Sequence, residues 1–393
     1  MISSTVLYTN EIDDLEQAAE ELFDQAEGFQ FQENTIGIMF MDVETEYPEL
    51  YEQLREKWAF PIVAATTIGM LNDHDGYCQS GISLMLLTTD DCRFAVGMTN
   101  GLTATNCHEV IRETYEKLEE ELGEEPKLVL TYGGKALEMS GDDIINVIDE
   151  MGKKAKMYGA LASDMFSFRD YRIALNEQYV MNAQVFILIA GNLNPKFVRV
   201  QSLSGKANFS YEVTQSKGNL VSRLGNGTLI EALNKSGLGS DNVLVAGEFI
   251  QTPFVTVLEK PGGVHVEALR NLTQLNHEDG SGLFLGAITE GSSLEIGLLN
   301  KEDVQTTVTQ AFDEIIEWLS GEGKGCSTIL CSSCTARFLA IGNNGNIEAD
   351  GYRGRLPEGI SLLGMYSYGE YCPVGDNEWC NVFHNSTFTM LCL

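Results

Sequence analysis

Basic residues are scarce in this chain, in which 25 lysines and arginines stand against 57 aspartates and glutamates, for a formal net charge of −32. Nucleic acids are bound by clustered lysine and arginine, so this balance argues against a nucleic-acid partner. It argues in the same way against binding to an anionic membrane surface. The acidity is typical instead of a highly soluble protein.

Export and membrane-spanning signals are also missing. Residues 1–10 contain no basic segment and their apolar run is broken, so they do not predict a secretory signal. No run approaches the roughly eighteen apolar residues that a membrane span needs. The nine cysteines are scattered and odd in number, and without an export signal we expect reduced thiols. These absences predict a cytoplasmic protein with no membrane partner.

Motifs of the commonest nucleotide-binding and catalytic sites are absent as well. The chain contains no P-loop, no dinucleotide-binding glycine motif after a strand, and neither HExxH nor GxSxG. We therefore expect no cofactor. The sequence leaves the question of an enzyme open, but no motif indicates one.

Several cysteines in the second half raise the question of a zinc or redox site. Cys331 and Cys334 form a CxxC pair, with Cys326, Cys372 and Cys380 elsewhere in the same half. Zinc needs four ligands in a compatible geometry, and the spacing of Cys372 and Cys380 suits a zinc knuckle poorly. A redox CxxC needs its own βαβ context. We expect no metal site.

Strand and helix patterns repeat once in the first half. Residues 35–66 predict a strand, a helix and a strand, and residues 127–160 repeat that order. This βαβ order implies parallel neighbouring strands joined by a right-handed crossover. Between the two units, residues 82–87 and 93–98 predict a hairpin across the polar turn at 88–91.

A domain boundary is expected near residues 205–219, which are small and polar with no long apolar run. The second half again mixes helices with strands, most of them predicted as antiparallel. We therefore predict a mixed α/β protein of the α+β class with two domains, residues 1–206 and 207–393. Each domain would have helices packed on mixed, largely antiparallel β-sheets.

Seven short segments resemble those of a known family. They are TTIG, GALASD, VTQSKGNLVSRLGNGT, the turn at Glu290 and Gly291, CTAR, MYSYGEYCP and FHNSTFTM. In this order they resemble the FIST family, sensory proteins in which an N-terminal FIST part precedes a C-terminal FIST part. The resemblance covers nearly the whole chain, and YSYGE and the closing HN-x-T-x-T are its most specific pieces.

The resemblance implies a ligand-binding signalling module, with amino acids or related small molecules as ligands. Relatives are often fused to histidine-kinase, chemotaxis-transducer, cyclic-di-GMP or F-box parts. Here the two FIST parts fill all 393 residues, so we expect the signal to pass to a separate protein, such as a kinase or a transducer. A second departure is TTIG at 66–69, where relatives often have a cysteine, so no thiol acts at that position.

The closing stretch, residues 361–393, combines strand-forming apolar residues with an unusual density of polar ones. At the joints, where the strand-forming runs meet the intervening polar segments, lie Tyr368 and Glu370, then His384 and Asn385. A polar group buried without a partner costs roughly 1–3 kcal/mol. These side chains therefore either line a pocket or satisfy one another. In a pocket, Glu370 would bind an ammonium or hydroxyl group, and His384 and Asn385 a carboxylate or amide.

Cys334 and Arg337 come directly after another predicted strand. If they open a helix, its N-terminus would favour an anion and lower the pKa of the thiol. The guanidinium of Arg337 also matches the geometry of a ligand carboxylate. The alternative is a buried structural cysteine and an ion-paired arginine. We favour the anion-binding role for Arg337 and the structural role for Cys334, and keep both as candidate ligand-binding residues.

Polar turns end the second strand of each βαβ unit. Thr66 and Thr67 lie in the first turn, and Ser163 and Asp164 lie in the second. In open α/β sheets, ligands bind at the carboxyl ends of strands, so these turns are candidates for binding a small polar or anionic ligand. The alternative is ordinary turn chemistry. Three aromatic residues after the second turn could cover such a pocket or belong to the core: Phe166, Phe168 and Tyr171.

Three functional hypotheses follow. The first is a cytoplasmic signal-transduction module that binds a small polar metabolite, such as an amino acid, between its halves, with Glu370 and Arg337 at the two charged ends of the ligand. The second is a cysteine-dependent hydrolase or transferase with Cys334 as nucleophile and His384 as base, which requires the two side chains within hydrogen-bonding distance. The third is a ligand-free scaffold that binds a signalling protein through its acidic face. We favour the first.

Overall fold

The computed structural model describes residues 2–134, 138–237, 252–260, 263–323, 325–375 and 379–393. Within them it contains eight helices and 26 strands. The strands form mixed sheets, and three of their pairings are parallel: β2 with β3, β8 with β9, and β22 with β23. The predicted α+β class with largely antiparallel sheets is confirmed.

Sheet 1 has the strand order β1-β6-β2-β3-β10-β11. Helices α1 (Leu15–Gln25) and α2 (Tyr47–Leu54) cover its outer face, and their apolar sides share one buried cluster with the sheet. Asp14 caps α1 by accepting a hydrogen bond from the backbone N–H of Gln17. The strands are β1 (Ser3–Thr9), β2 (Asn34–Met41), β3 (Ile62–Thr66), β6 (Ile82–Thr89), β10 (Ile173–Leu175) and β11 (Gln178–Val180).

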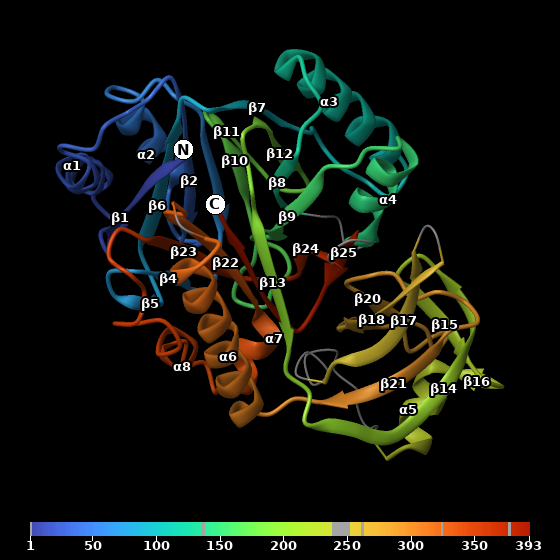
Figure 1. The fold of residues 1–393 in the computed structure, drawn as a ribbon. Helices are drawn as coiled ribbons and strands as arrows, with labels where there is room; N and C mark the ends of the chain where they lie inside the picture. Colours follow the sequence, from blue (N-terminus) through green and yellow to red (C-terminus); the bar gives the residue numbers. More distant parts are fainter. Residues whose placement is uncertain (1, 135–137, 238–251, 261–262, 324, 376–378) are drawn as a thin grey trace.

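Sheet 2 has the order β25-β24-β9-β8-β12-β7, and helices α3 (Cys107–Leu122) and α4 (Asp142–Glu150) lie on its outer side (Figure 1). Its first two strands come from the end of the chain. The strands are β7 (Cys92–Met98), β8 (Leu128–Gly133), β9 (Lys156–Leu161), β12 (Gln184–Gly191), β24 (Glu370–Val374) and β25 (Cys380–His384).

Sheet 3 has the order β13-β26-β22-β23-β4-β5. It is covered by α6 (Lys301–Ser320), α7 (Thr335–Ala340) and α8 (Asn346–Ala349). Two of its strands come from the first hundred residues. The strands are β4 (Met70–Asn72), β5 (Gly76–Cys78), β13 (Lys196–Gln201), β22 (Thr328–Cys334), β23 (Ser361–Ser367) and β26 (Thr387–Cys392).

The three sheets have the same topology, a central parallel pair with two antiparallel strands on either side. In each case the outer hairpin belongs to a different chain unit. The hairpin after β3 (β4–β5) joins sheet 3, the hairpin after β23 (β24–β25) joins sheet 2, and the hairpin after β9 (β10–β11) joins sheet 1. The body of the molecule is therefore a ring of three units that exchange hairpins in a cycle.

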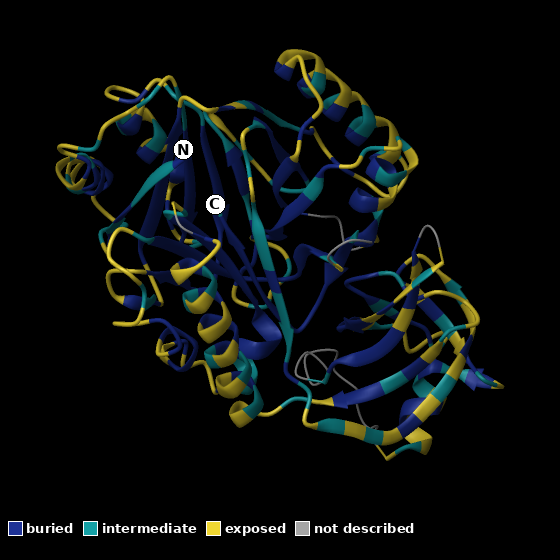
Figure 2. Ribbon diagram, in the orientation of Figure 1, coloured by how far each residue is buried: buried dark blue, intermediate teal, exposed yellow. Residues whose placement is uncertain are grey.

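The inner faces of the three sheets pack on one another around a common core, to which β3, β9 and β23 all contribute. Helices cover the outer faces, so the central strands are buried on both sides, as Figure 2 shows in dark blue. This explains why β6 and β23 are near-continuous apolar runs rather than alternating ones.

The predicted hairpin at 82–87 and 93–98 is wrong. β6 pairs with β1 and β2 in sheet 1, whereas β7 pairs with β12 in sheet 2. The polar turn between the two strands carries the chain from one sheet to the next. A short turn between strands does not by itself require them to pair.

A fourth sheet is inserted into the third unit, between β13 and α6. The described residues of the segment 205–298, which we call the inserted part, form this sheet around their own core. Helix α5 (Leu229–Lys235) packs on it. The predicted boundary at 206/207 falls at the start of its first strand, and β22 to β26 return to the body. The strands are β14 (Gly205–Lys217), β15 (Leu220–Leu224), β16 (Gly227–Thr228), β17 (Phe254–Lys260), β18 (Val264–Arg270), β19 (Leu272–Leu275), β20 (Gly282–Phe284) and β21 (Ser293–Leu298).

Candidate functional site

The closing stretch forms four strands that belong to two sheets. β23 and β26 lie in sheet 3, and β24 and β25 lie in sheet 2. The polar joints are the turns where the chain crosses between these sheets, at 368–369 and 385–386. All four of the predicted site residues in this stretch, Tyr368, Glu370, His384 and Asn385, are buried.

Three turns of the body meet at these joints, one from each unit. Each follows the third strand of its unit: 67–69 after β3, 162–164 after β9, and 368–369 after β23. The hydroxyls of Thr67 and Ser163 donate to the same acceptor, the backbone oxygen of Tyr366, at 2.8 and 2.6 Å. The Tyr368 hydroxyl donates to the backbone oxygen of Asp164 at 3.0 Å and also to its carboxylate. The structure thus brings together Thr67, Ser163, Asp164 and Tyr368. Their role in ligand binding stays a prediction.

Asp164 organises the loop that follows β9. Its carboxylate accepts hydrogen bonds from the backbone N–H groups of residues 168, 169 and 170, at 3.0, 2.8 and 2.8 Å, and from the hydroxyl of Ser167 at 2.7 Å. Burial raises the pKa of Asp164, but the hydrogen bonds from Tyr368 and the loop outweigh it and hold the pKa below its usual range. Thr66 fixes the far end of this loop by accepting from the N–H of Arg172 at 2.9 Å.

Two phenylalanines of this loop have left-handed backbone conformations. Phe166 has φ +63° and Phe168 has φ +54°. For bulky residues this region costs roughly 1–3 kcal/mol each, and such strain is concentrated at functional sites. The ring of Phe168 stacks on Tyr368 with 4.2 Å between ring centroids.

A small cavity of about 10 Å³ lies under the stacked rings of Phe168 and Tyr368. This volume holds about one water molecule. A larger ligand therefore requires the loop to move. Besides the two rings, the cavity is lined by Gly134, Leu161, Ala162, Tyr171 and, from the inserted part, Leu285.

Glu370 is fully buried and bonded to two hydroxyls. Ser367 donates to its Oε1 at 2.7 Å and Thr387 donates to its Oε2 at 2.6 Å. Burial raises the pKa of Glu370 to about 8, because the hydrogen bonds offset only part of the desolvation of the charge. The side chain is therefore mostly a neutral acid at pH 7. Sequence reasoning missed the role of Ser367.

His384 and Asn385 each have an acceptor atom without a hydrogen-bond partner among the described residues. His384 Nε2 lies 3.0 Å from the backbone oxygen of Cys372. Burial and then the charge of Arg199 hold the pKa of His384 well below its usual range, so the ring is neutral. Nε2 must then carry the proton, and Nδ1 is the unpaired acceptor. Asn385 donates through Nδ2 to the backbone oxygen of Tyr368 at 3.2 Å, and its Oδ1 is unpaired.

Arg337 is fully buried, and its ion-pair partner is Glu348 on α8. Their closest approach is 2.7 Å, from Nη2 to Oε1, and further hydrogen bonds join the guanidinium to the hydroxyls of Ser333 and Ser202. The expected pairing of Arg337 with a ligand opposite Glu370 is therefore replaced by an internal ion pair. Sequence reasoning missed Glu348 because it lies in the irregular, glycine-rich segment before β23.

Cys334 is buried at the end of β22, where it precedes the six-residue helix α7. Burial raises the pKa of its thiol well above the usual value, and the charge of Glu370 raises it further. His384, the proposed base, is directed instead to the carbonyl of Cys372. A thiol that resists ionisation and a neutral imidazole bonded elsewhere do not form a nucleophile–base pair. The structure therefore favours the structural role for Cys334.

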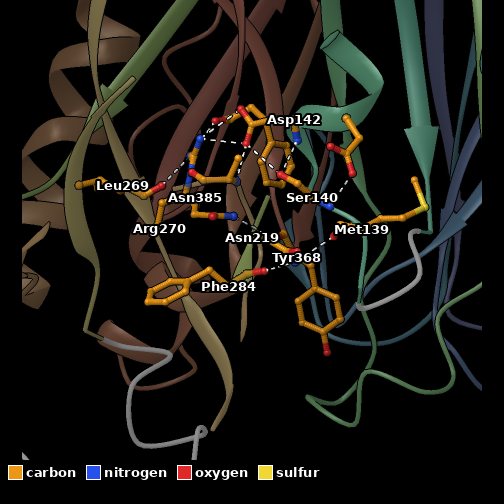
Figure 3. Close-up of polar contacts among 12 residues, drawn as sticks. Met139, Ser140, Asp142, Asn219, Leu269, Arg270, Phe284, Tyr368 and Asn385 are labelled. Carbon is orange, nitrogen blue, oxygen red and sulfur yellow. Dashed lines mark hydrogen bonds and ion pairs between the residues drawn. The ribbon is translucent and has the colours of Figure 1, made fainter. Parts of the chain in front are cut away.

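The contact between the inserted part and the body is a second polar centre, shown in Figure 3. Arg270 is fully buried and forms two hydrogen bonds with Asp142 of α4, at 3.1 and 3.0 Å. The same guanidinium donates to the backbone oxygen of Phe383 at 3.0 Å. Nearby, Ser386 donates to Asn271 at 2.9 Å. Sequence reasoning missed this ion pair, because its partners are separated by 128 residues.

The described part of the chain holds no group of three or more His, Cys, Asp or Glu side chains that could bind a metal ion. None of its helices is both long and apolar enough to cross a membrane.

Comparison with known proteins gives two matches to family models. Residues 35–226 match the FIST N domain and residues 234–373 match the FIST C domain. No curated protein matches the chain. Among solved structures, a chorismatase crystal structure is similar with a TM-score of 0.36 and 10% identity, over 100% of this chain and 98% of that one. A cyanuric acid hydrolase is similar with a TM-score of 0.26 and 8% identity, over 67% and 83%. Both similarities are too weak to support a functional argument.

Proposed function

The chain belongs to the FIST family of sensory domains, and from this premise we propose that it is a cytoplasmic signal-transduction module that senses a small polar metabolite, such as an amino acid. The binding site in this proposal is the cavity below Phe168 and Tyr368. The loop at 164–171 acts as its lid.

The observation that supports this proposal most directly is the strained lid. Phe168, which lines the cavity, and Phe166, two residues before it, are held at positive φ, and the hydrogen bonds of Asp164 compensate for that strain. If those hydrogen bonds were released, the backbone of both phenylalanines could leave its left-handed conformation. Release of this strain would favour a second, open arrangement of the loop. A ligand that binds better to one arrangement would shift the population between them.

The polarity of the surroundings supports an amino acid as the ligand class. The cavity walls are mainly apolar and would take a side chain. Asn385 is bonded to the backbone of Tyr368 and has an unpaired acceptor, which would suit an ammonium or hydroxyl donor. The carboxylate end would use backbone N–H groups of the opened loop, because Arg337 is already paired with Glu348.

The output of this sensor is a separate signalling protein, such as a kinase or a transducer. An opened lid would expose the aromatic rings of Phe166 and Phe168, which are half-buried, and of Tyr171, which is buried. Exposed aromatic side chains are typical anchors of protein interfaces. The partner would therefore distinguish the ligand-free from the ligand-bound protein by the state of the lid.

A thermal-shift screen of the twenty amino acids and small carboxylic acids tests the proposal. We expect at least one compound to raise the Tm of the wild-type protein. The Tyr368→Phe variant keeps the stacked ring but loses the hydrogen bonds to Asp164 that hold the lid closed, so the open arrangement is favoured and the Kd for that compound should fall roughly tenfold. Tyr211→Phe, in the inserted part, should leave the Kd unchanged.

Two results would contradict the proposal. One is a flat screen, in which no compound changes the Tm. The other is a ligand whose Kd is the same in Tyr368→Phe and in the wild type. A signalling protein that binds equally well with and without every compound would favour the ligand-free scaffold instead.

A further inference from the structure

A second, basic pocket lies on a different part of the body, where β13 passes beside β24 and the start of β9 (Figure 1). Its volume is about 350 Å³, which is at the small end of the range for sites that bind metabolites. Its described lining residues are Lys156, Pro195, Lys196, Phe197, Arg199, Pro373, Val374 and Gly375.

The charge of this lining contrasts with the charge of the molecule. Lysine and arginine make up only 25 of the 393 residues, yet three of the eight described lining residues are basic and none of the eight is acidic. A small pocket of one sign focuses its field on a ligand of the opposite sign. In a chain with a net charge of −32, such a concentration of positive charge points to an anion.

Arg199 provides an independent observation. Its Nη1 is buried and has no hydrogen-bond partner among the described residues. A buried N–H group of a guanidinium without a partner is unfavourable, and the partial burial of Arg199 lowers its pKa. Glu267 and the thiol of Cys372 lie near enough to oppose this shift, but neither is bonded to the arginine. A bound anion would satisfy it.

The two lysines differ in how available they are. Lys196 forms an ion pair of 2.8 Å with Glu314, which is more than half exposed. Lys156 lies 5.5 Å from the ring centroids of both Phe197 and Trp379 and forms no ion pair with a described residue. The aromatic rings hold the Lys156 ammonium at the pocket without neutralising it. An anion here would therefore meet Arg199 and Lys156 directly.

We propose that this pocket, formed by Lys156, Phe197 and Arg199 beside β24, is a binding site for a small organic anion with carboxylate or phosphate groups. Arg199 supplies the fork-shaped donor that such groups prefer, and Lys156 supplies a second charge. Pro195, Phe197, Pro373 and Val374 receive the apolar part of the molecule. This site is separate from the cavity under Phe168 and does not depend on the sensor proposal.

Calorimetric titration of the full chain with malonate and with inorganic phosphate tests this site, and malonamide serves as the uncharged analogue. We expect binding of malonate or phosphate and none of malonamide. Arg199→Gln and Lys156→Gln should each raise the Kd by roughly tenfold or more, because each removes a charge-assisted contact. Lys217→Gln, an exposed lysine in β14 with the same change of charge, should leave the Kd unchanged.

The variants also separate a specific site from a general salt effect. Arg199→Gln removes a half-buried charge whose Nη1 has no partner among the described residues, so we expect it to fold with a Tm at or above that of the wild type. If it does not fold, Lys156→Gln alone decides the question. The proposal is overturned if the wild type binds neither anion, or if the folded pocket variants bind as tightly as Lys217→Gln.

Discussion

Glu370 illustrates how the environment of one residue sets its chemistry. The sequence showed that a carboxyl lies among strand residues, but not whether it would be charged. It is fully buried, and the hydrogen bonds of Ser367 and Thr387 and the charge of Arg337 offset only part of its desolvation, so burial raises its pKa to about 8. A neutral acid in the core is compatible with a self-satisfied network, and it explains why Arg337 is free to pair with Glu348.

The raised pKa predicts that Glu370 makes the protein less stable as the pH increases. Below about 4.5 both the folded and the unfolded states hold the proton, so the group contributes no pH dependence. Between about 4.5 and 8 the unfolded state releases it while the folded state retains it, so the free energy of unfolding falls by up to about 5 kcal/mol.

Chemical denaturation of Glu370→Gln at pH 5 and at pH 8 measures this loss. Glutamine has no proton to release, so the variant should gain stability relative to the wild type by several kcal/mol between the two pH values. Glu317→Gln, at an exposed position of α6, should show no such gain. A wild type and a Glu370→Gln variant whose stabilities change in parallel with pH would show that the acid is ionised in the core.

Elements of the fold were predictable where the signal is local. The two βαβ units, the α+β class and the burial of the polar residues in the closing stretch all follow from patterns within a few tens of residues. Which sheet a strand joins depends on contacts over hundreds of residues, and no local pattern specifies it. The pattern of the closing stretch therefore indicated strand-forming residues, but not that the stretch supplies four strands to two sheets. The pair of Arg270 with Asp142, 128 residues apart, was missed for the same reason. Glu348 lies only 11 residues after Arg337 and was missed because its segment is irregular.

Gly159 shows how closely the backbone of β9 approaches that of its neighbour β8. It lies inside β9 at φ +152°, between Thr131 of β8 and Tyr371 of β24, and a Cβ there would lie 1.7 Å from the backbone oxygen of Thr131. Gly159→Ala should therefore lower the free energy of unfolding by about 3 kcal/mol or more, because two strands must separate.

Gly152 is the matched control for this prediction. It has φ +71° in the turn after α4, and a Cβ there would have no neighbour within 4 Å. Gly152→Ala should cost only the left-handed conformation, about 1 kcal/mol. Urea unfolding of both variants gives the comparison. Equal losses would mean that β9 and β8 are not packed as closely as described.

The whole molecule is held together by the cyclic exchange of hairpins. Strands from both sides of residue 206 pair in sheets 2 and 3: β24 with β9, β26 with β13, and β23 with β4. The inserted part, by contrast, enters and leaves the body at one place, where the N–H of Ser204 bonds to the oxygen of Leu298 at 2.9 Å. The boundary at 206/207 stays a prediction from the sequence, and it can be tested against this connectivity.

Two shortened chains make that test. A fragment of residues 1–206 lacks β22 to β26, so we expect it to show no cooperative unfolding transition in urea. A chain without residues 205–298, with Ser204 linked to Leu299, keeps every strand of the three body sheets and should unfold cooperatively at a lower urea concentration than the wild type, because the Arg270–Asp142 contact is lost. A fragment 1–206 that melts cooperatively would establish the division as a folding boundary.

Because hairpins are exchanged between units, some strands remain without their neighbouring strand while the rest of the chain is synthesised. The edge of β9 is complete only when β24 is made, about two hundred residues later, which at roughly 5–20 residues per second takes on the order of 10–40 s. Throughout that time β9 and β4 have unpaired edges that invite pairing with other nascent chains. Mutual repulsion between strongly acidic chains opposes such encounters. The excess of negative charge would therefore protect the chain from aggregation most during its synthesis, before the ring of three units has formed.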